Sequence, residues 1–151
     1  MKPIRLLLPF LLVALLMGGC SRYREVVDTN FATGGKDLAV VEAAVKTSLK
    51  HFNWQVIQDE KGLIVARYDK AKHYVLINIK YSDSKVDISY LKSEGLRYKE
   101  VDGKRMIHKR YNQWIANLQR RIEVELNPMG DPVPQATPTG DASSDAPLTM
   151  P

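Results

Sequence analysis

The sequence predicts an α+β fold: a two-layer domain with an N-terminal helix, a four-stranded antiparallel meander and a long C-terminal helix. Two regions, 38–52 and 104–126, repeat apolar residues at steps of three and four, the spacing of amphipathic helices. Between them, apolar and polar residues alternate over short segments joined by short polar links. Each helix has an apolar stripe to bury, and one face of the sheet would cover both.

The first helix is expected from Leu38 to Phe52. Asp37 precedes it, and its carboxylate can accept a hydrogen bond from the free amides of the first turn. The apolar face of this helix comprises Leu38, Val41, Val45, Leu49 and Phe52. Gly34 and Gly35 favour a turn just before it.

Four strands follow, at residues 54–58, 63–68, 73–81 and 85–91. Turn residues at 59–62 and 82–84 separate them. In the third strand Val75, Ile77 and Ile79 point to one side, which predicts one buried and one solvated face.

The second helix is expected from Lys104 to Leu126, where Asn127 and Pro128 end it. Its apolar stripe comprises Ile107, Tyr111, Trp114, Ile115, Leu118 and Ile122. We expect Tyr111 and Trp114 to be core residues, although the aromatic residues could instead line a groove for a peptide or glycan.

The chain therefore divides into four parts, which are an N-terminal segment (1–19), a spacer (20–36), the α+β domain (37–126) and a disordered proline-rich tail (127–151). The tail is too polar and too rich in proline to bury an apolar core. Charge is unevenly distributed. Residues 20–126 hold 20 lysines and arginines against 14 acids, a net charge of +6, whereas the tail holds three aspartates and no base.

The first nineteen residues have the pattern of an export signal. Lys2 and Arg5 precede an uncharged run, 6–17, that is too short to cross a bilayer as a helix. Gly18 and Gly19 then lead to Cys20, the only cysteine of the chain. A single cysteine excludes an intramolecular disulfide.

The motif Met17-Gly18-Gly19-Cys20 resembles the lipoprotein signal peptides of bacteria, although methionine stands where leucine is usual. The resemblance implies cleavage before Cys20 and a lipid anchor, palmitate included, on its sulfur. Ser21, which is not aspartate, implies retention at the outer membrane, facing the periplasm. An ordinary secretory signal with a chance cysteine is the alternative, and a signal-anchor helix is a weaker one.

The segment 81–122 resembles small uncharacterised bacterial lipoproteins. The resemblance rests on Tyr90, Ile107, His108, Tyr111, Asn112, Trp114 and Ile115. It implies a shared helix–meander–helix domain and no known activity.

The chemistry-bearing residues do not predict an enzyme. His51, His73 and His108 stand at no metal-ligand spacing, and no nucleophile or phosphate-loop motif accompanies them. We therefore expect no catalytic residue, no metal and no cofactor. An envelope enzyme or metal binder built around a histidine pocket is the least favoured alternative.

Basic residues are concentrated in and beside the second helix. The candidate contact residues are Lys109, Arg110, Arg120 and Arg121. A positive face attracts an acidic envelope protein, anionic lipid or lipopolysaccharide. It would attract nucleic acid equally, but for an exported protein we expect no nucleic-acid partner. The expected function is a lipid-anchored, non-catalytic binding or assembly module. The alternatives are a binder of anionic lipid or lipopolysaccharide, an exposed sheet edge as the contact surface, and a merely solvated helix face.

Overall fold

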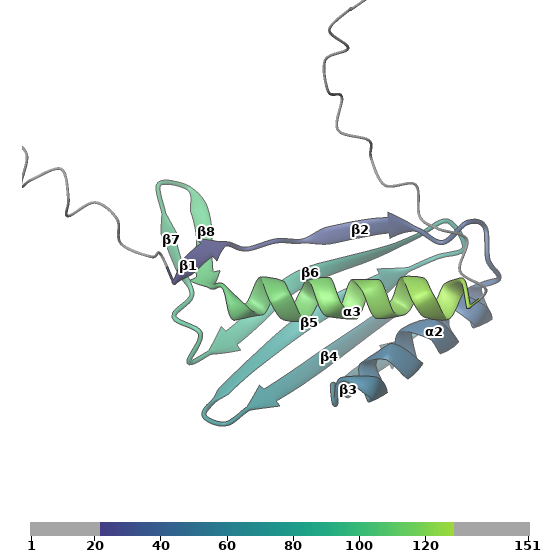
Figure 1. The fold of residues 1–151 in the computed structure, drawn as a ribbon, viewed down its shortest axis with the longest axis horizontal. Coiled ribbons are helices and arrows are strands. Elements are labelled where there is room, and N and C mark those ends of the chain that lie inside the picture. Colours follow the sequence, from purple (N-terminus) through teal and green to yellow (C-terminus); the bar gives the residue numbers. More distant parts are fainter. Residues whose placement is uncertain (1–21, 129–151) are drawn as a thin grey trace, which may run out of the picture.

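The computed structural model describes residues 22–128, which form an α+β domain with two helices and two antiparallel sheets (Figure 1). In chain order the elements are β1 (Tyr23–Glu25), β2 (Thr29–Ala32), α2 (Leu38–His51), β3 (Gln55–Glu60), β4 (Leu63–Lys70), β5 (His73–Tyr81), β6 (Lys85–Glu94), β7 (Lys99–Val101), β8 (Lys104–His108) and α3 (Arg110–Leu126). The predicted export signal (1–19), Cys20 and most of the predicted tail (129–151) lie outside the described residues. Neither described helix is long and apolar enough to cross a membrane.

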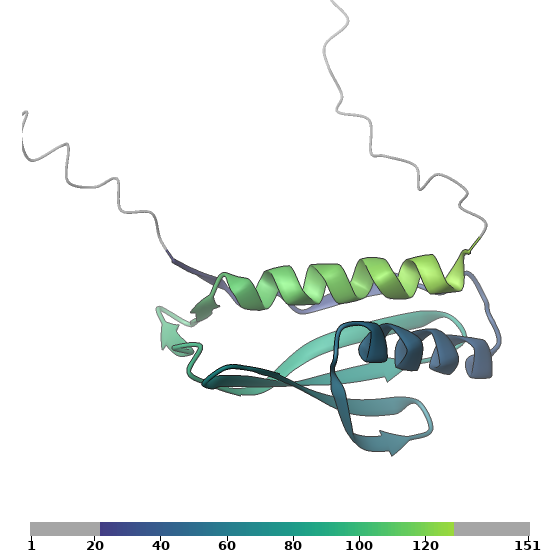
Figure 2. The ribbon, with the colours of Figure 1, turned by 60° about the horizontal axis from the view of Figure 1, so that its bottom comes forward.

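The larger sheet has the order β2-β6-β5-β4-β3, and both helices cover the same face of it (Figures 1 and 2). The meander β3–β6 confirms the four predicted strands, and α2 confirms the first predicted helix to within one residue. The Asp37 carboxylate accepts a hydrogen bond from the Ala39 N–H at 2.8 Å, which is the predicted N-cap.

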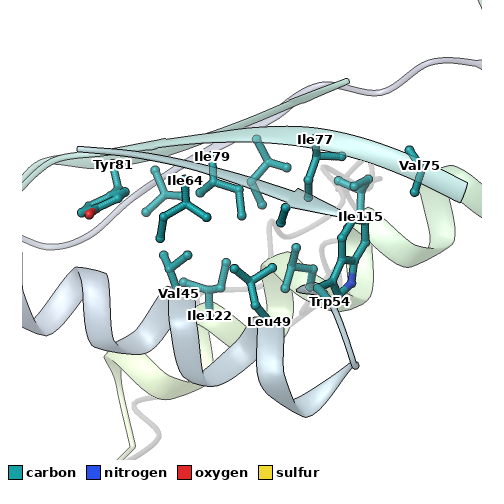
Figure 3. Packing of buried hydrophobic residues seen from close by; sticks show 14 of the residues in the cluster. Val45, Leu49, Trp54, Ile64, Val75, Ile77, Ile79, Tyr81, Ile115 and Ile122 are labelled. Carbon is teal, nitrogen blue, oxygen red and sulfur yellow. The ribbon is translucent and has the colours of Figure 1, made fainter. Parts of the chain in front are cut away.

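The core lies between the larger sheet and the two helices (Figure 3). Val75, Ile77 and Ile79 of β5 point toward the helices and are completely buried, as their alternation predicted. They meet Leu49 of α2 and Ile122 of α3, which are also completely buried. Burying one such side chain contributes about 1.5–3 kcal/mol.

The predicted spacer is wrong for residues 22–32, because this segment forms two strands. β1 pairs with β8, and β2 pairs with β6 at the edge of the larger sheet. Each strand has only three or four residues, so its stability comes from partners far along the chain rather than from a local pattern.

The connection between these two strands is held by side chains of other elements. Asn112 of α3 donates a hydrogen bond to the Glu25 carbonyl at 2.8 Å and accepts one from the Val27 N–H at 3.2 Å. Asp28 accepts from the Tyr90 N–H at 2.9 Å and forms an ion pair with Arg105 at 2.8 Å. The N-terminal segment is thereby attached to both sheets and to α3.

The predicted start of the second helix is also wrong, because residues 104–108 form strand β8. The turn Asp102-Gly103 joins β7 to β8, and both residues have positive φ, 51° and 74°. This is the conformation of a tight hairpin turn, for which Asp-Gly is a strong sequence signal. Ile107 fits the apolar stripe of the predicted helix, but in the structure it is a buried residue of strand β8.

Candidate binding groove along helix α3

Three adjoining hollows form a groove along one side of α3. The first, of about 70 Å³, is lined by Lys70, His73, Gly95, Leu96, His108, Arg110 and Trp114. The second, of about 40 Å³, is lined by Phe52, Trp54, Tyr68, Trp114 and Asn117. The third, of about 330 Å³, is lined by Phe52, Asn117, Arg120, Arg121 and Val124. Shared residues join each hollow to the next, and we call the whole the α3 groove.

The helical repeat places the groove beside the core. The α3 residues that line the groove are Arg110, Trp114, Asn117, Arg120, Arg121 and Val124. The buried stripe of the same helix comprises Tyr111, Ile115, Leu118, Ile122 and Leu126. Members of the first set, such as Trp114, Asn117 and Arg121, each precede a residue of the buried stripe by one position. One position is about 100° around the helix, so the two sets occupy neighbouring faces. From residue 110 to residue 124 the helix rises about 21 Å, which sets the length of the groove.

Aromatic rings line the middle of the groove. The ring centroids of Trp54 and Tyr68 are 5.1 Å apart, and those of Tyr68 and Trp114 are 5.0 Å apart with an interplanar angle of 68°. Such pairs contribute about 0.5–1.5 kcal/mol each beyond the area they bury. Trp114 is half-buried, so it packs against the core as expected and also presents a surface to the groove.

Cations stand at both ends of the groove. Lys70 and Arg110 line one end, and Arg120 and Arg121 line the other. Arg121 forms an ion pair with Glu125, one turn further along α3, so its charge is compensated. Arg120 is exposed and forms no ion pair within residues 22–128, which makes it the stronger candidate for contact with an anion.

The structure therefore separates the four predicted contact residues. Arg110, Arg120 and Arg121 line the α3 groove, but the first lies about 15 Å along the helix from the other two. Lys109 is exposed beside the groove and does not line it, and its N–H donates to the Arg22 carbonyl at 3.0 Å. The predicted basic face is thus two cationic ends with aromatic rings between them.

Two histidines lie at the Arg110 end of the groove. Nδ1 of His108 accepts a hydrogen bond from the Arg110 N–H at 3.3 Å. Burial lowers the pKa of His108, and the positive charges of Arg110 and Lys109 lower it further. The backbone of Gly95, at φ 76°, packs on His73 so closely that a Cβ there would lie 2.0 Å from Nδ1. Lys70 and Arg110 are the lysine and the arginine that line this end of the groove.

A larger hollow, of about 660 Å³, opens at the start of α2. Lys36 and Lys61 line it, but so do Asp37 and Asp83, and Asp37 already accepts a hydrogen bond from the first turn of the helix. The opposing carboxylates make it a poor anion site. Within residues 22–128 no group of three or more histidine, cysteine, aspartate or glutamate side chains is placed to hold a metal ion.

No protein-family model matches the chain, and no curated protein matches it at a significant level.

Sequence reasoning gave an aromatic groove only as an alternative and did not say which residues would share it. Phe52 comes from the end of α2, Tyr68 from β4 and Trp114 from α3, and only the fold brings them together. A local signal existed for α3 alone, since Arg110, Trp114 and Asn117 form a second stripe beside the core stripe.

Proposed function

We propose that this protein is a lipid-anchored lipoprotein of the bacterial cell envelope whose domain, residues 22–128, is a non-catalytic binding module. Its ligand is an acidic, partly apolar segment of an envelope protein, and its binding site is the α3 groove. The observation that supports this assignment best is the row of aromatic rings between two cationic ends. Ser21 favours the outer membrane as the site of attachment.

The groove suits an extended peptide of about six residues, because such a peptide spans about 20 Å at 3.3 Å per residue. The apolar side chains of the ligand would gain free energy by covering Trp114 and Phe52, at about 25 cal/mol per Å² of apolar surface removed from water. The arginines would attract the acidic ligand and set its orientation, since charge complementarity acts mainly on association and specificity.

The groove is tested by placing a photocrosslinking amino acid at Asn117 in the full chain in its own cells. We expect a crosslink to one envelope protein, and we expect Arg110→Glu combined with Arg120→Glu to reduce it at least about tenfold. That factor corresponds to about 1.4 kcal/mol of binding free energy. Arg110→Glu cancels the charge of Lys70 at one end of the groove. Arg120→Glu makes the other end negative, because Arg121 is already paired with Glu125.

The matched control is Lys80→Glu, an exposed residue of β5 on the opposite face of the larger sheet. The crosslink should persist in this variant. Equal crosslinking in all variants would contradict the groove assignment. A crosslink to lipid or lipopolysaccharide alone would favour the second candidate, an anionic lipid binder, for which the same arginines are the supporting observation.

The lipid anchor is tested by Cys20→Ala. Cys20 is the only cysteine, so no other thiol of the chain can form the thioether. We expect the wild-type protein to incorporate a palmitate analogue during growth and to sediment with membranes, and the variant to lose the label completely. Labelling of the variant at the wild-type level would contradict the anchoring proposal.

A further inference from the structure

The fold begins almost at the proposed lipid site. Only Ser21 and Arg22 separate Cys20 from Tyr23, the first residue of β1. The Arg22 carbonyl already accepts a hydrogen bond from the Lys109 N–H, so Arg22 is held against the start of α3. At about 3.6 Å per residue, the Cα atom of Cys20 lies within about 7 Å of that of Arg22. A lipid on Cys20 would therefore keep the small sheet at the membrane surface.

The end of the domain that contains this sheet is rich in exposed cations. The sheet β1-β8-β7 lies beside the start of α3, at the opposite end of the helix from Leu126 (Figure 1). The exposed basic residues of these strands and of the segments that flank them, which we call the basic end, are Arg22, Arg24, Arg97, Lys99, Lys104 and Lys109. Three exposed acids, Glu25, Glu100 and Asp102, accompany them, and a fourth, Asp28, is compensated by its ion pair with Arg105, so positive charge prevails.

The hairpin of β7 and β8 adds an apolar contact to this charge. Val101, next to the hairpin turn, is 41% exposed and stands between Lys99 and Lys104 in the chain. Tyr23 accompanies it on β1, where the Lys99 ammonium lies 5.1 Å from the ring centroid. Cations around an apolar and an aromatic side chain match the boundary between anionic headgroups and acyl chains.

The charge of the chain also differs between the two ends of α3. The chain leaves the domain beyond Leu126, and the remaining residues hold three aspartates and no base. An anionic surface would therefore attract the end that starts at Arg22 and repel the segment that follows α3.

We propose that the basic end docks on anionic lipid headgroups, with Val101 at the surface and Arg120 directed away from the membrane. The inference rests on the proposed lipid at Cys20. Attachment supplies a high effective concentration, so a weak attraction suffices to orient the domain. The distal half of the α3 groove is then held open to the periplasm.

The test uses the lipidated chain in vesicles, with a fluorescent amino acid at position 101 or, as a control, at position 61 in the far turn between β3 and β4. The vesicles contain a nitroxide-labelled lipid and are either phosphatidylcholine alone or a mixture with phosphatidylglycerol. In the anionic vesicles we expect quenching at position 101 to exceed that at position 61 at least about threefold. The difference should disappear in 1 M salt, where the screening length falls to about 3 Å.

Charge reversal at the basic end, by Arg24→Glu, Lys99→Glu and Lys104→Glu together, should remove the difference. The same change at the far end, by Lys36→Glu, Lys61→Glu and Lys85→Glu with the probe at position 101, should leave it intact. Equal quenching at the two positions, or equal quenching at position 101 in neutral and anionic vesicles, would overturn the docking proposal.

Mass spectrometry of the same samples separates the two proposals. If Cys20 carries no lipid, the anchoring proposal has failed. The chain beginning at Cys20 is then coupled through that thiol to a maleimide lipid, and the comparison between positions 101 and 61 still decides whether the basic end docks.

Discussion

Replacing Tyr111 with alanine is expected to lower the free energy of unfolding by about 3–5 kcal/mol, the usual cost of truncating a buried aromatic side chain. Tyr111 is completely buried at the start of α3, and its ring meets the Tyr90 ring edge-on at a centroid distance of 5.6 Å. Tyr90 is in turn stacked on Tyr98 at 4.9 Å. Removing the Tyr111 ring would leave a cavity where α3 meets the two sheets.

Tyr111→Phe is the matched control, and we expect it to leave stability unchanged or to raise it by about 1 kcal/mol. The Tyr111 hydroxyl is buried and has no hydrogen-bond partner among the residues that the structure describes. Removing such a group also removes the cost of its desolvation. Urea denaturation of a chain that begins at Cys20 measures both variants. A loss above about 1 kcal/mol in Tyr111→Phe would contradict the unpaired hydroxyl.

The wild-type protein and Tyr111→Phe should also differ in how their stability changes at alkaline pH. Burial raises the pKa of Tyr111 above its ordinary value of about 10. The unfolded chain therefore loses this proton first, and wild-type stability declines as pH rises above about 10. The contribution is fully present below that pH. Tyr111→Phe lacks the ionising group, so its decline between pH 9 and 11 should be smaller.

Val26→Asp is expected to destabilise the protein by about 3 kcal/mol or more, whereas Val27→Asp should cost less than about 1 kcal/mol. Val26 is 6% exposed and its N–H donates to the Arg105 carbonyl at 2.7 Å, while Val27 is 47% exposed. The first substitution loses about 1.5–3 kcal/mol of apolar burial and also places a carboxylate in an apolar site.

Thermal unfolding measures this difference directly. One kcal/mol corresponds to about 4–8 °C in a domain of this size, so Val26→Asp should lower Tm by about 10 °C or more. The two substitutions are adjacent and chemically identical, so they control for each other. Equal Tm values would mean that residues 22–32 are a spacer after all, as the local sequence suggested.

Local periodicity explains the successful predictions. The alternation of β5 and the stripe of α2 depend only on the geometry of one strand or one helix, which repeats every two or 3.6 residues. Asp37 acts on amides two residues away, and its role could also be read from the sequence. The positions of Arg110, Arg120 and Arg121 on α3 follow from the same helical repeat.

The two incorrect predictions concern strands without a long pattern. Ile107 in β8 has the spacing of the apolar stripe of α3, which made residues 104–108 resemble the first turn of a helix. The Asp102-Gly103 turn was the sequence signal for a hairpin strand instead. β1 and β2 are too short for any periodicity, and their pairing spans more than fifty residues of chain. Such pairing depends on which edges the rest of the fold leaves available.

The sequence by itself determined the fold class, the meander, the first helix and the cationic character of the second, because each depends on neighbours within a few residues. Only the tertiary structure decided that Phe52, Tyr68 and Trp114 share one groove, and that Arg121 is compensated while Arg120 is not. It also decided that two residues rather than sixteen separate Cys20 from the domain. These are relations between elements far apart in the chain, and they are set by how the sheets and helices pack.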